Sequence, residues 1–360
     1  MRALIVGTGP TGAGICRYLR KNLRNKVKEI VVFDKARGPG GRFATHRLDS
    51  NEWIKADTGA QYITQGAGST APDLEVYEEL ETSGTIRRLP EEQVFGVREK
   101  TGKSHFVAPE GLSSVPKYML DRFDARVRYS TRLCRLERRE GSKWSTTCET
   151  YDRGTVEDIF DVVFLTIPAT QLLADVKGDT HFERILSPHR HRLENVQYSR
   201  RFAAVCRFDG PIDALSNIKW TTAYVDDCES LRYVSNETRK MNLDSGADSS
   251  GGVTLLLHSS VPYAIEHFDT PRDLVRDHML GDLARFLNCD LPEPSYTKVH
   301  RWKYSQCMAP GELSASPALS LGDGLYIAGD GLVGSNFDNC MRSAKFVVDA
   351  FLSDHANALL

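Results

Sequence analysis

The sequence predicts a two-domain α/β protein that opens with a Rossmann-like βαβ unit. The first observation is a short apolar run, Leu4–Val6, followed at once by a G-x-G-x-x-G motif at Gly7, Gly9 and Gly12. The second is the run 28–34, typical of the next strand, which ends in an acid about twenty residues beyond the last glycine. The third is the length of 360 residues with 41% hydrophobic content, enough for two substantial cores.

Each residue of the opening motif has a separate physical task. Gly7 permits the tight turn, Gly9 lets the backbone approach a pyrophosphate, and Gly12 lets the helix pack closely on the strand. The first turn of that helix offers free N–H groups and a partial positive charge to phosphates. The acid that ends the second strand, Asp34, can accept hydrogen bonds from a ribose. The segment therefore predicts a dinucleotide site.

Two further glycine clusters change the expected ligand. Gly40-Gly41-Arg42 follows the second strand closely, where it can supply bare backbone and a guanidinium to phosphate oxygens. A second literal G-x-G-x-x-G runs from Gly329 to Gly334, between an apolar strand and the last helix. Too little chain follows for a second Rossmann domain, so we expect this cluster to complete the first site. Asp330 can bind polyol hydroxyls, and the last helix can stabilise a group that becomes anionic on reduction, which is what a flavin requires.

The remaining patterns predict the following elements. Helices are expected over 74–84, 113–123, 182–193, 271–287 and 338–352. Strands are expected over 160–168, 202–208, 231–234, 253–261 and 325–328, with short pieces within 87–107 and a hairpin of 132–138 and 143–148 around 140–142. The stretch Ser235–Gly252, rich in Ser, Asn, Asp and Gly, is expected to be a long exposed loop or partly disordered.

Composition excludes several classes of function. The formal net charge of −2 gives no reason to expect a nucleic-acid partner, and no apolar run is long enough to cross a membrane. Eight cysteines without a C-x-x-C pair argue against a zinc site and a disulfide scaffold, so we expect Cys134 and Cys148 of the hairpin to be free thiols. Residues 1–6 resemble a signal peptide only faintly and are the first strand, which favours an uncleaved, cytoplasmic protein.

Motifs in order along the chain resemble the amine-oxidase-like FAD superfamily and, within it, the renalase family. The superfamily motifs include the two glycine clusters of the first domain, Asp57-x-Gly59-Ala60-Gln61-Tyr62, Leu165-Thr166-Ile167-Pro168 and Gly329-Asp330-Gly331. The narrower resemblance rests on 59–64, 106–109, 198–201, 258–262, 301–306 and 330–338. The sequence departs from that pattern in longer loops at Ser235–Gly252 and Glu149–Glu157.

The resemblance implies a p-hydroxybenzoate-hydroxylase-like fold, with a discontinuous Rossmann-like FAD-binding domain and a mostly antiparallel α+β substrate domain. We expect the first to comprise 1–80, 108–170 and 308–360, and the second 81–107 and 171–307. The implied activity is oxidation of isomeric 2- and 6-dihydroNAD(P) to NAD(P)+ by hydride transfer to flavin N5, with O2 reduced to H2O2. This is a metabolite-repair reaction that needs orientation rather than protein acid–base chemistry.

The predicted site residues fall into two groups. Non-covalent FAD is expected to contact Gly7, Gly9, Thr11, Gly12, Asp34, Lys35, Gly41, Arg42, Gly59, Ala60, Gln61, Tyr62, Leu133, Thr166, Pro168, Asp330, Ser335, Asn336 and Phe337. The substrate pocket is expected to use Gln61, Tyr62, His258, Trp302 and Arg201, with no classical catalytic residue and no metal. Strand alternation is expected to turn Leu256, His258 and Ser260 to one face.

Two other functions remain open from the sequence. An amine oxidase acting on catecholamines or polyamines is compatible with the superfamily motifs. A secreted signalling or binding protein would need a cleavable export signal at the position of the first strand. A nicotinamide-dependent disulfide reductase is excluded, because a second complete nucleotide domain and a C-x4-C pair are both missing.

Overall fold

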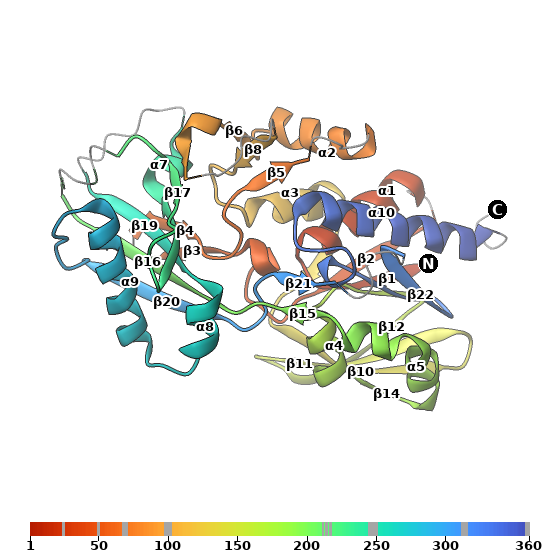
Figure 1. Ribbon diagram of the computed structural model, residues 1–360. Helices are drawn as coiled ribbons and strands as arrows, with labels where there is room; N and C mark the ends of the chain where they lie inside the picture. Colours follow the sequence, from red (N-terminus) through yellow and green to blue (C-terminus); the bar gives the residue numbers. More distant parts are fainter. Residues whose placement is uncertain are drawn as a thin grey trace. The chain divides into compact units, whose positions relative to one another are not determined.

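The computed structural model describes residues 1–23, 26–48, 51–66, 71–96, 103–210, 212, 215, 218–243, 251–310 and 316–356. The chain divides into two compact units, and each is built from separated segments. Unit 1 comprises Met1–Gly41, Val115–Tyr198 and Gln306–Leu360, and unit 2 comprises Arg42–Ser114 and Ser199–Ser305. Figure 1 shows the elements of both units along the chain.

Unit 1 is built on a largely parallel sheet. Its strands are β1 (Arg2–Val6), β2 (Glu29–Phe33), β9 (Arg126–Arg128), β13 (Val162–Leu165), β22 (Ala318–Gly322) and β23 (Leu325–Ala328). They lie in the order β22-β23-β13-β1-β2-β9, and only β22 runs antiparallel to its neighbour. The predicted βαβ start is confirmed, because β1 and β2 pair in parallel and are joined by α1 (Pro10–Leu23).

Helices cover one face of this sheet. On that face lie α1 and α10 (Phe337–Asp354), and Figure 1 shows them side by side. Phe351 of α10 packs against the rings of Phe164 and Tyr326, at centroid distances of 5.8 Å and 6.0 Å. The close approach of the helices depends on Gly14, because a Cβ there would lie 2.9 Å from the Cβ of Ala344.

A second, smaller sheet shares a core with the other face. It contains β10 (Thr131–Arg139), β11 (Lys143–Thr150), β12 (Gly154–Phe160) and β14 (Lys177–Gly178), in the order β12-β11-β10-β14. The helices α4 (Ala169–Asp175) and α5 (Thr180–Glu194) pack into this core, and β15 (Gln197–Tyr198) pairs with β21 (Cys307–Ala309). The predicted hairpin is confirmed, but a bulge at Cys134 places Leu133 opposite Cys148. Both cysteines are free, as expected.

Unit 2 is built on a mixed, mostly antiparallel sheet in the order β20-β16-β19-β18-β17-β7. The strands are β7 (Val94–Phe95), β16 (Arg201–Phe208), β17 (Thr222–Tyr224), β18 (Leu231–Asn236), β19 (Val253–Ser259) and β20 (Tyr296–Trp302). One face packs on α8 (Val261–Glu266) and α9 (Arg272–Leu287), which contributes Val275, Met279 and Leu283 at helical spacing. The opposite face, here called the polar face, carries His258, Tyr233, Tyr224, Trp302 and Arg201 at paired positions.

Smaller elements complete unit 2. They are β3 (Thr45–Leu48), β4 (Asn51–Asp57), β5 (Ile63–Gln65), α2 (Ala71–Thr82), β6 (Arg87–Leu89), η2 (Glu91–Gln93), β8 (Ser104–Val107) and α7 (Glu237–Met241). The short helix η1 (Gly41–Phe43) begins at the last residue of the first segment of unit 1. Along the chain, unit 1 resumes at the second residue of α3 (Ser114–Arg122), and η4 (Asp330–Leu332) lies in the last segment of unit 1. Ile54 and Ala56 of β4 pack on the polar face against Ala203 and Leu256.

Three local predictions were wrong. Ser235–Gly252 is not a continuous loop: Ser235 and Asn236 end β18, and α7 follows, while 244–250 lie outside the described residues. Glu149–Glu157 is mostly strand, because β11 and β12 leave only 151–153 as the turn. The strand expected to reach Val261 ends at Ser259, because the Oγ of Ser260 accepts a hydrogen bond from the N–H of Tyr263 and caps α8.

The compact units differ from the predicted domain boundaries. Residues 42–80 and 108–114 fall in unit 2, because β4 joins the core of the polar face. Residues 171–198 fall in unit 1, because Phe182 and Leu186 of α5 join the core beneath the parallel sheet. The assignment of one unit to cofactor and the other to substrate stays a prediction.

Candidate flavin and substrate sites

The carboxyl ends of four parallel strands bring the predicted cofactor residues of unit 1 to one edge of the sheet. Residues Gly7, Asp34, Thr166 and Gly329 directly follow β1, β2, β13 and β23. Ligands of open α/β sheets bind at this edge. Because β23 belongs to the same sheet as β1, the second G-x-G-x-x-G starts at the same edge of that sheet and forms no domain of its own.

Two of the three glycines of the first motif have no room for a side chain. Gly7 has φ +117°, and a Cβ on it would lie 2.6 Å from the Oγ1 of Thr166. A Cβ on Gly12 would lie 2.0 Å from the carbonyl oxygen of Gly7, so the start of α1 can pack on β1 only without a side chain there. Around Gly9, in contrast, a Cβ would meet nothing closer than the carbonyl oxygen of Gly40, at 3.8 Å.

Gly40 and Gly41 lie on the other side of the free space around Gly9. The N–H of Gly40 donates to the carbonyl oxygen of Thr8 (3.3 Å), and a Cβ on Gly41 would lie 3.5 Å from the Cα of Gly9. The next residue, Arg42, begins unit 2, where its carbonyl oxygen accepts from the N–H of Ala60. The first turn of α1 directs its N–H groups toward a ligand at this position, since they have no partners within the helix.

Asp34 is held rigidly at the end of β2. Its Oδ2 accepts hydrogen bonds from the N–H (2.8 Å) and the Oγ1 (2.5 Å) of Thr8, and its Oδ1 accepts from the N–H of Ala36 (2.8 Å). A carboxylate has about four acceptor sites, so Oδ1 retains one for a ribose hydroxyl. The neighbouring Lys35 is exposed.

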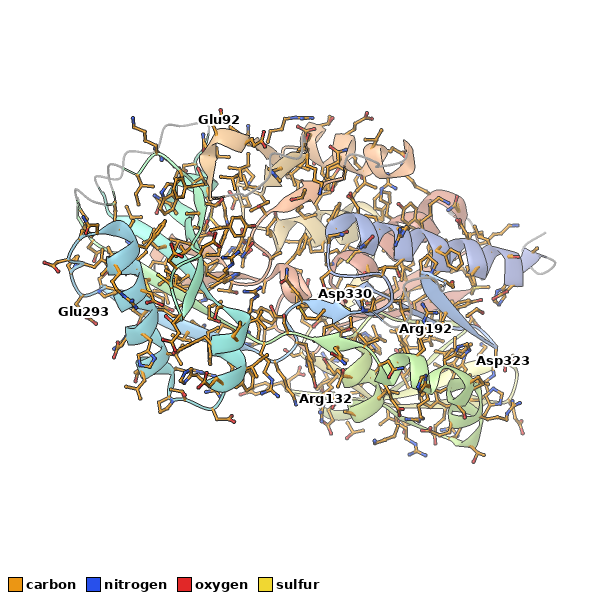
Figure 2. The ribbon with its side chains drawn as sticks, viewed as in Figure 1. Glu92, Arg132, Arg192, Glu293, Asp323 and Asp330 are labelled. Atoms are coloured by element: carbon orange, nitrogen blue, oxygen red, sulfur yellow. The ribbon has the colours of Figure 1, made fainter. Side chains whose placement is uncertain are left out.

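The C-terminal cluster is ordered by hydrogen bonds among its own residues and with Cys307. The Oγ of Ser335 donates to the Oδ2 of Asp330 (2.5 Å) and accepts from the N–H of Cys307 (2.7 Å). Asn336 caps α10 through its Oδ1, which accepts from the N–H of Asn339, and the next residue, Phe337, is buried. Asp330 lies in the turn between β23 and α10, where Figure 2 labels it.

Three predicted contacts of unit 1 have clear structural environments. The Oγ1 of Thr166 donates to the carbonyl oxygen of Val6 (2.8 Å), and Pro168 begins α4 as its N-cap. Leu133 is buried in the core beneath the sheet, and Thr11 is buried at the start of α1. Their contacts with a cofactor stay predictions.

In unit 2 the structure brings Gln61 and Tyr62 together with His258. The Oη of Tyr62 lies 2.8 Å from the Oη of Tyr224, which donates to the Oε1 of Gln61 (3.2 Å). The Nε2 of Gln61 lies 3.3 Å from the Nδ1 of His258. Because the amide nitrogen donates, Nδ1 must accept, and the neutral ring carries its proton on Nε2.

His258 is kept neutral by its surroundings. The side chain is 3% exposed, and burial lowers its pKa to about 3, with Arg201 and Lys240 adding to the shift. The backbone of Thr58 opposes this shift in part, but Nε2 forms no hydrogen bond within the described part of the chain. Burial likewise raises the pKa values of Tyr62, Tyr224 and Tyr233, so these phenols also stay neutral.

Trp302 and Arg201 lie opposite each other on β20 and β16. The indole Nε1 of Trp302 donates to the carbonyl oxygen of Thr58 (2.7 Å), which ties the ring to the backbone that leads into Gly59. Arg201 donates from Nη1 to the carbonyl oxygen of Ser259 (2.8 Å), and burial lowers its pKa. Leu256 shares the polar face with His258 as predicted, whereas Ser260 lies beyond the strand as the cap of α8.

Sequence reasoning missed several residues of the polar face. Tyr224 and Tyr233 were not assigned, and Asp57, Glu237 and Lys240 form a buried ion cluster that was not expected. Asp57 was visible as part of a motif. The spacing of Glu237 and Lys240 at i and i+3 was also visible, but nothing in the sequence marked them as buried.

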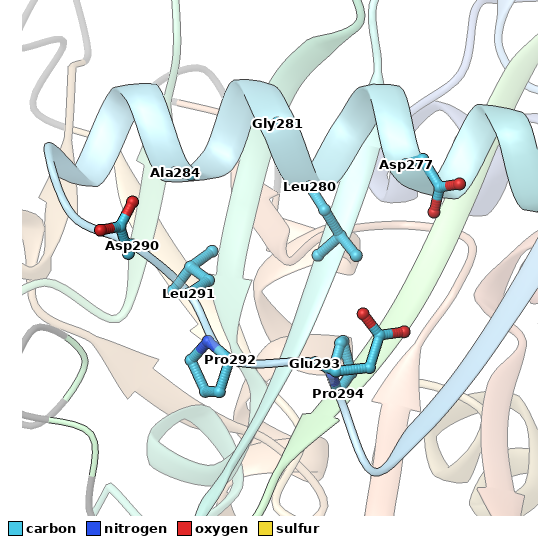
Figure 3. Close-up of a pocket in the computed structure, with 9 residues that line it drawn as sticks. All are labelled: Asp277, Leu280, Gly281, Ala284, Asp290, Leu291, Pro292, Glu293 and Pro294. Atoms are coloured by element: carbon cyan, nitrogen blue, oxygen red, sulfur yellow. The ribbon is translucent and has the colours of Figure 1, made fainter.

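A surface pocket in unit 2 lies away from the predicted site residues. It is bounded by α9 and the segment that follows it, and Figure 3 shows Asp277 and Leu280 extending toward Pro292 and Glu293. Its nine lining residues include three carboxylates and none of the predicted site residues. The described residues contain no cluster of His, Cys, Asp or Glu able to hold a metal, and no described helix is long and apolar enough to cross a membrane.

Comparison with known proteins decides the family. The model of the family described as "Flavin containing amine oxidoreductase" matches residues 94–352, and that of the "NAD(P)-binding Rossmann-like domain" matches 5–79. The chain belongs to the flavin-containing amine oxidoreductase family. This chain is 31% identical to renalase of Mus musculus over 352 residues, which are 96% of this chain and 97% of the relative.

Solved structures show the same fold at low identity. A putative protoporphyrinogen oxidase from Exiguobacterium sp. 255-15 has a TM-score of 0.70 at 16% identity and covers 97% of this chain and 98% of its own. Putrescine oxidase bound to putrescine has a TM-score of 0.66 at 12% identity and covers 98% and 99%. The predicted α/β fold class and the renalase-like resemblance are therefore confirmed.

The residues of unit 1 fit the flavin cofactor of this family of oxidoreductases. The bare backbone around Gly9 and Gly41 leaves room for a pyrophosphate, and Asp34 retains an acceptor for a ribose. Asp330 and the N-terminus of α10 suit a polyol chain and the polar edge of the ring.

Proposed function

We propose that this protein is an FAD-dependent oxidase that converts 2- and 6-dihydroNAD(P) to NAD(P)+. Bound FAD would accept the hydride at N5 and pass its two electrons to O2, so that H2O2 forms. The match to renalase along nearly the whole chain supports this proposal. We further propose that the FAD is held without a covalent bond, by Gly7, Gly9, Gly12, Gly41 and the other predicted cofactor residues.

The charge of the five predicted pocket residues is the observation that carries the choice of substrate. The five predicted pocket residues include one cation, Arg201, and no carboxylate, while Gln61, Tyr62, Trp302 and neutral His258 complete the set. A dihydropyridine loses only a hydride when it becomes a pyridinium, so its oxidation needs no protein base. Groups that do not titrate near neutral pH are sufficient for this reaction.

The residues of unit 2 have positioning tasks in this function. His258 would line the substrate pocket as a neutral ring, and its tautomer is fixed through Gln61 and Tyr224. Arg201 supplies a positive charge for a phosphate-bearing substrate. Trp302 offers an apolar surface next to the Thr58 backbone.

The runner-up is an amine oxidase, which the family supports as a class. A polyamine carries several positive charges, and Arg201 would repel them where a carboxylate would attract them. Arg201 therefore favours the dinucleotide over a polyamine.

Anaerobic mixing tests the proposal directly. The purified holoprotein should lose its flavin absorbance within seconds of mixing with 6-dihydroNAD and regain it with O2, with one H2O2 formed per NAD+. Putrescine and a catecholamine at equal concentration should leave the flavin oxidised. A flavin that stays oxidised with both dihydroNAD isomers, or is bleached as fast by an amine, would refute the proposal.

A further inference from the structure

A fully buried ion cluster lies beneath the turn that carries Gln61 and Tyr62. The Nζ of Lys240 lies 3.0 Å from the Oδ2 of Asp57 and 2.6 Å from the Oε1 of Glu237. The side chains of all three residues are 0% exposed. Two carboxylates therefore share one ammonium group in the interior of unit 2.

A buried ion cluster contributes little net free energy to the stability of a short helix. Desolvation of buried charges offsets most of their attraction, so apolar residues of similar size would fix α7 at least as well. Buried ionic groups are best explained where they specify one geometry. Here burial raises the pKa of Glu237 although Lys240 opposes this, and the two carboxylates raise the pKa of Lys240 despite its burial.

The cluster holds both ends of one turn. At the start, the N–H of Asp57 donates to the Oε2 of Glu237 (2.9 Å), and the Oδ1 of Asp57 accepts from the N–H of Leu112 (2.8 Å). At the end, the Nζ of Lys240 donates to the carbonyl oxygen of Gln61 (3.4 Å). The backbone from 57 to 61 is therefore fixed from α7.

The middle of the turn is held by unit 2 as well. The N–H of Ala60 donates to the carbonyl oxygen of Arg42 (2.7 Å), and a Cβ on Gly59 would lie 1.9 Å from that same oxygen. The turn therefore has little freedom, and a shift of the Gln61 backbone must move its side chain. That side chain contacts His258 and Tyr224.

We propose that Lys240, held between Asp57 and Glu237, is a positioning residue that fixes the backbone of Gln61 and, through the Gln61 side chain, sets the orientation of His258 and Tyr224 on the polar face. The inference concerns the site assigned under the proposed function and rests on it for the choice of substrate. Lys240 itself takes no part in hydride transfer.

A pair of variants tests the positioning role without leaving two buried carboxylates unpaired. The single variant Lys240→Met leaves two buried carboxylates without a cation and is expected to fold poorly. The double variant Glu237→Gln/Lys240→Met leaves only Asp57 charged, with its donors Thr45 and Leu112 intact. Its reference is Glu237→Gln alone, which keeps Lys240 paired with Asp57 and bonded to Gln61.

Two measurements compare the double variant with that reference. Hydrogen–deuterium exchange of the amides of residues 58–62 should be about tenfold faster or more, while exchange of β16 and β19 stays the same. The kcat/KM for 6-dihydroNAD should fall about tenfold or more at a temperature well below unfolding, since small misplacements of binding groups are costly. Both changes together support the positioning role.

Other results would overturn it. Unchanged exchange in 58–62, or unchanged kcat/KM in a variant whose only defect is a lower melting temperature, would show a merely structural cluster. If the wild-type protein oxidises no dihydronicotinamide, the proposed function fails while the exchange comparison still decides whether Lys240 orders the turn.

Discussion

The buried, neutral His258 predicts that unit 2 loses stability as the pH falls below about 6.5. The pKa of this ring is about 3 in the folded protein, against about 6.5 in an unfolded chain. Between these two values the unfolded state binds a proton that the folded state does not, so the free energy of unfolding decreases as the pH is lowered. The stabilising effect of neutral His258 is complete above pH 6.5.

The magnitude follows from the two pKa values. From pH 7.5 to pH 5.0 the single ring should remove about 2 kcal/mol of unfolding free energy, at about 1.4 kcal/mol for each pH unit below 6.5. Because pH 5.0 lies well above the folded value, this figure depends on the unfolded pKa and changes little if the folded pKa is one unit higher.

Urea unfolding of wild type and of His258→Asn at both pH values measures this effect. Asparagine does not titrate, so the free energy of unfolding of the variant should fall by about 2 kcal/mol less than that of wild type between pH 7.5 and pH 5.0. Other titrating groups contribute equally to both proteins and cancel in the comparison. Equal losses in the two proteins would show that His258 is protonated at pH 5.0 in the folded state, and the reasoning from burial would fail.

Three further predictions concern the two sites and α10. Gly12→Ala should abolish flavin binding, because its Cβ would lie 2.0 Å from the oxygen of Gly7, whereas Gly38→Ala meets no atom within 4 Å and should keep the flavin spectrum. Tyr224→Phe removes the donor to the Oε1 of Gln61. It should lower kcat/KM for 6-dihydroNAD roughly 3- to 10-fold without loss of bound flavin. An unchanged kcat/KM would contradict the role of this hydrogen bond. Asn336→Ala should lower the free energy of unfolding by about 1 kcal/mol in urea titrations, and Asn336→Ser should restore most of it; equal values for all three proteins would contradict the cap.

The part of the fold that could be predicted depends on local signals. The opening motif specifies β1, the turn and α1 in part through Gly12, whose Cβ would lie 2.0 Å from the carbonyl oxygen of Gly7, a contact within the motif itself. The last helix was predicted from residue 338 and begins at Phe337, because its cap is also local. Apolar periodicity likewise placed α9, whose buried residues Val275, Met279 and Leu283 face one core.

The structure differs from the sequence prediction where stability comes from distant residues. The segment 235–243 has the composition of an exposed loop, and a five-residue helix is not stable in isolation. It is helical here because Asn236 caps it and because Lys240 meets Asp57, a residue far away in the sequence. Charged side chains are normally exposed, so no pattern within the segment indicates that these are buried.

The same distinction explains which half of the candidate site could be predicted. In unit 1 the groups expected to contact the cofactor are mainly backbone N–H groups and glycines at strand ends, so a motif specifies them almost completely. In unit 2 the properties of His258 depend on strand register, which places Tyr233 and Ala203 on either side of it, and on the partner of Gln61. Alternation along β19 predicts the face of His258 but not its neutrality, because neutrality requires burial by residues from three other segments. A search for similar sites in related chains should therefore test for burial of the histidine and for a cation beneath the Gln61 turn, rather than for the histidine alone.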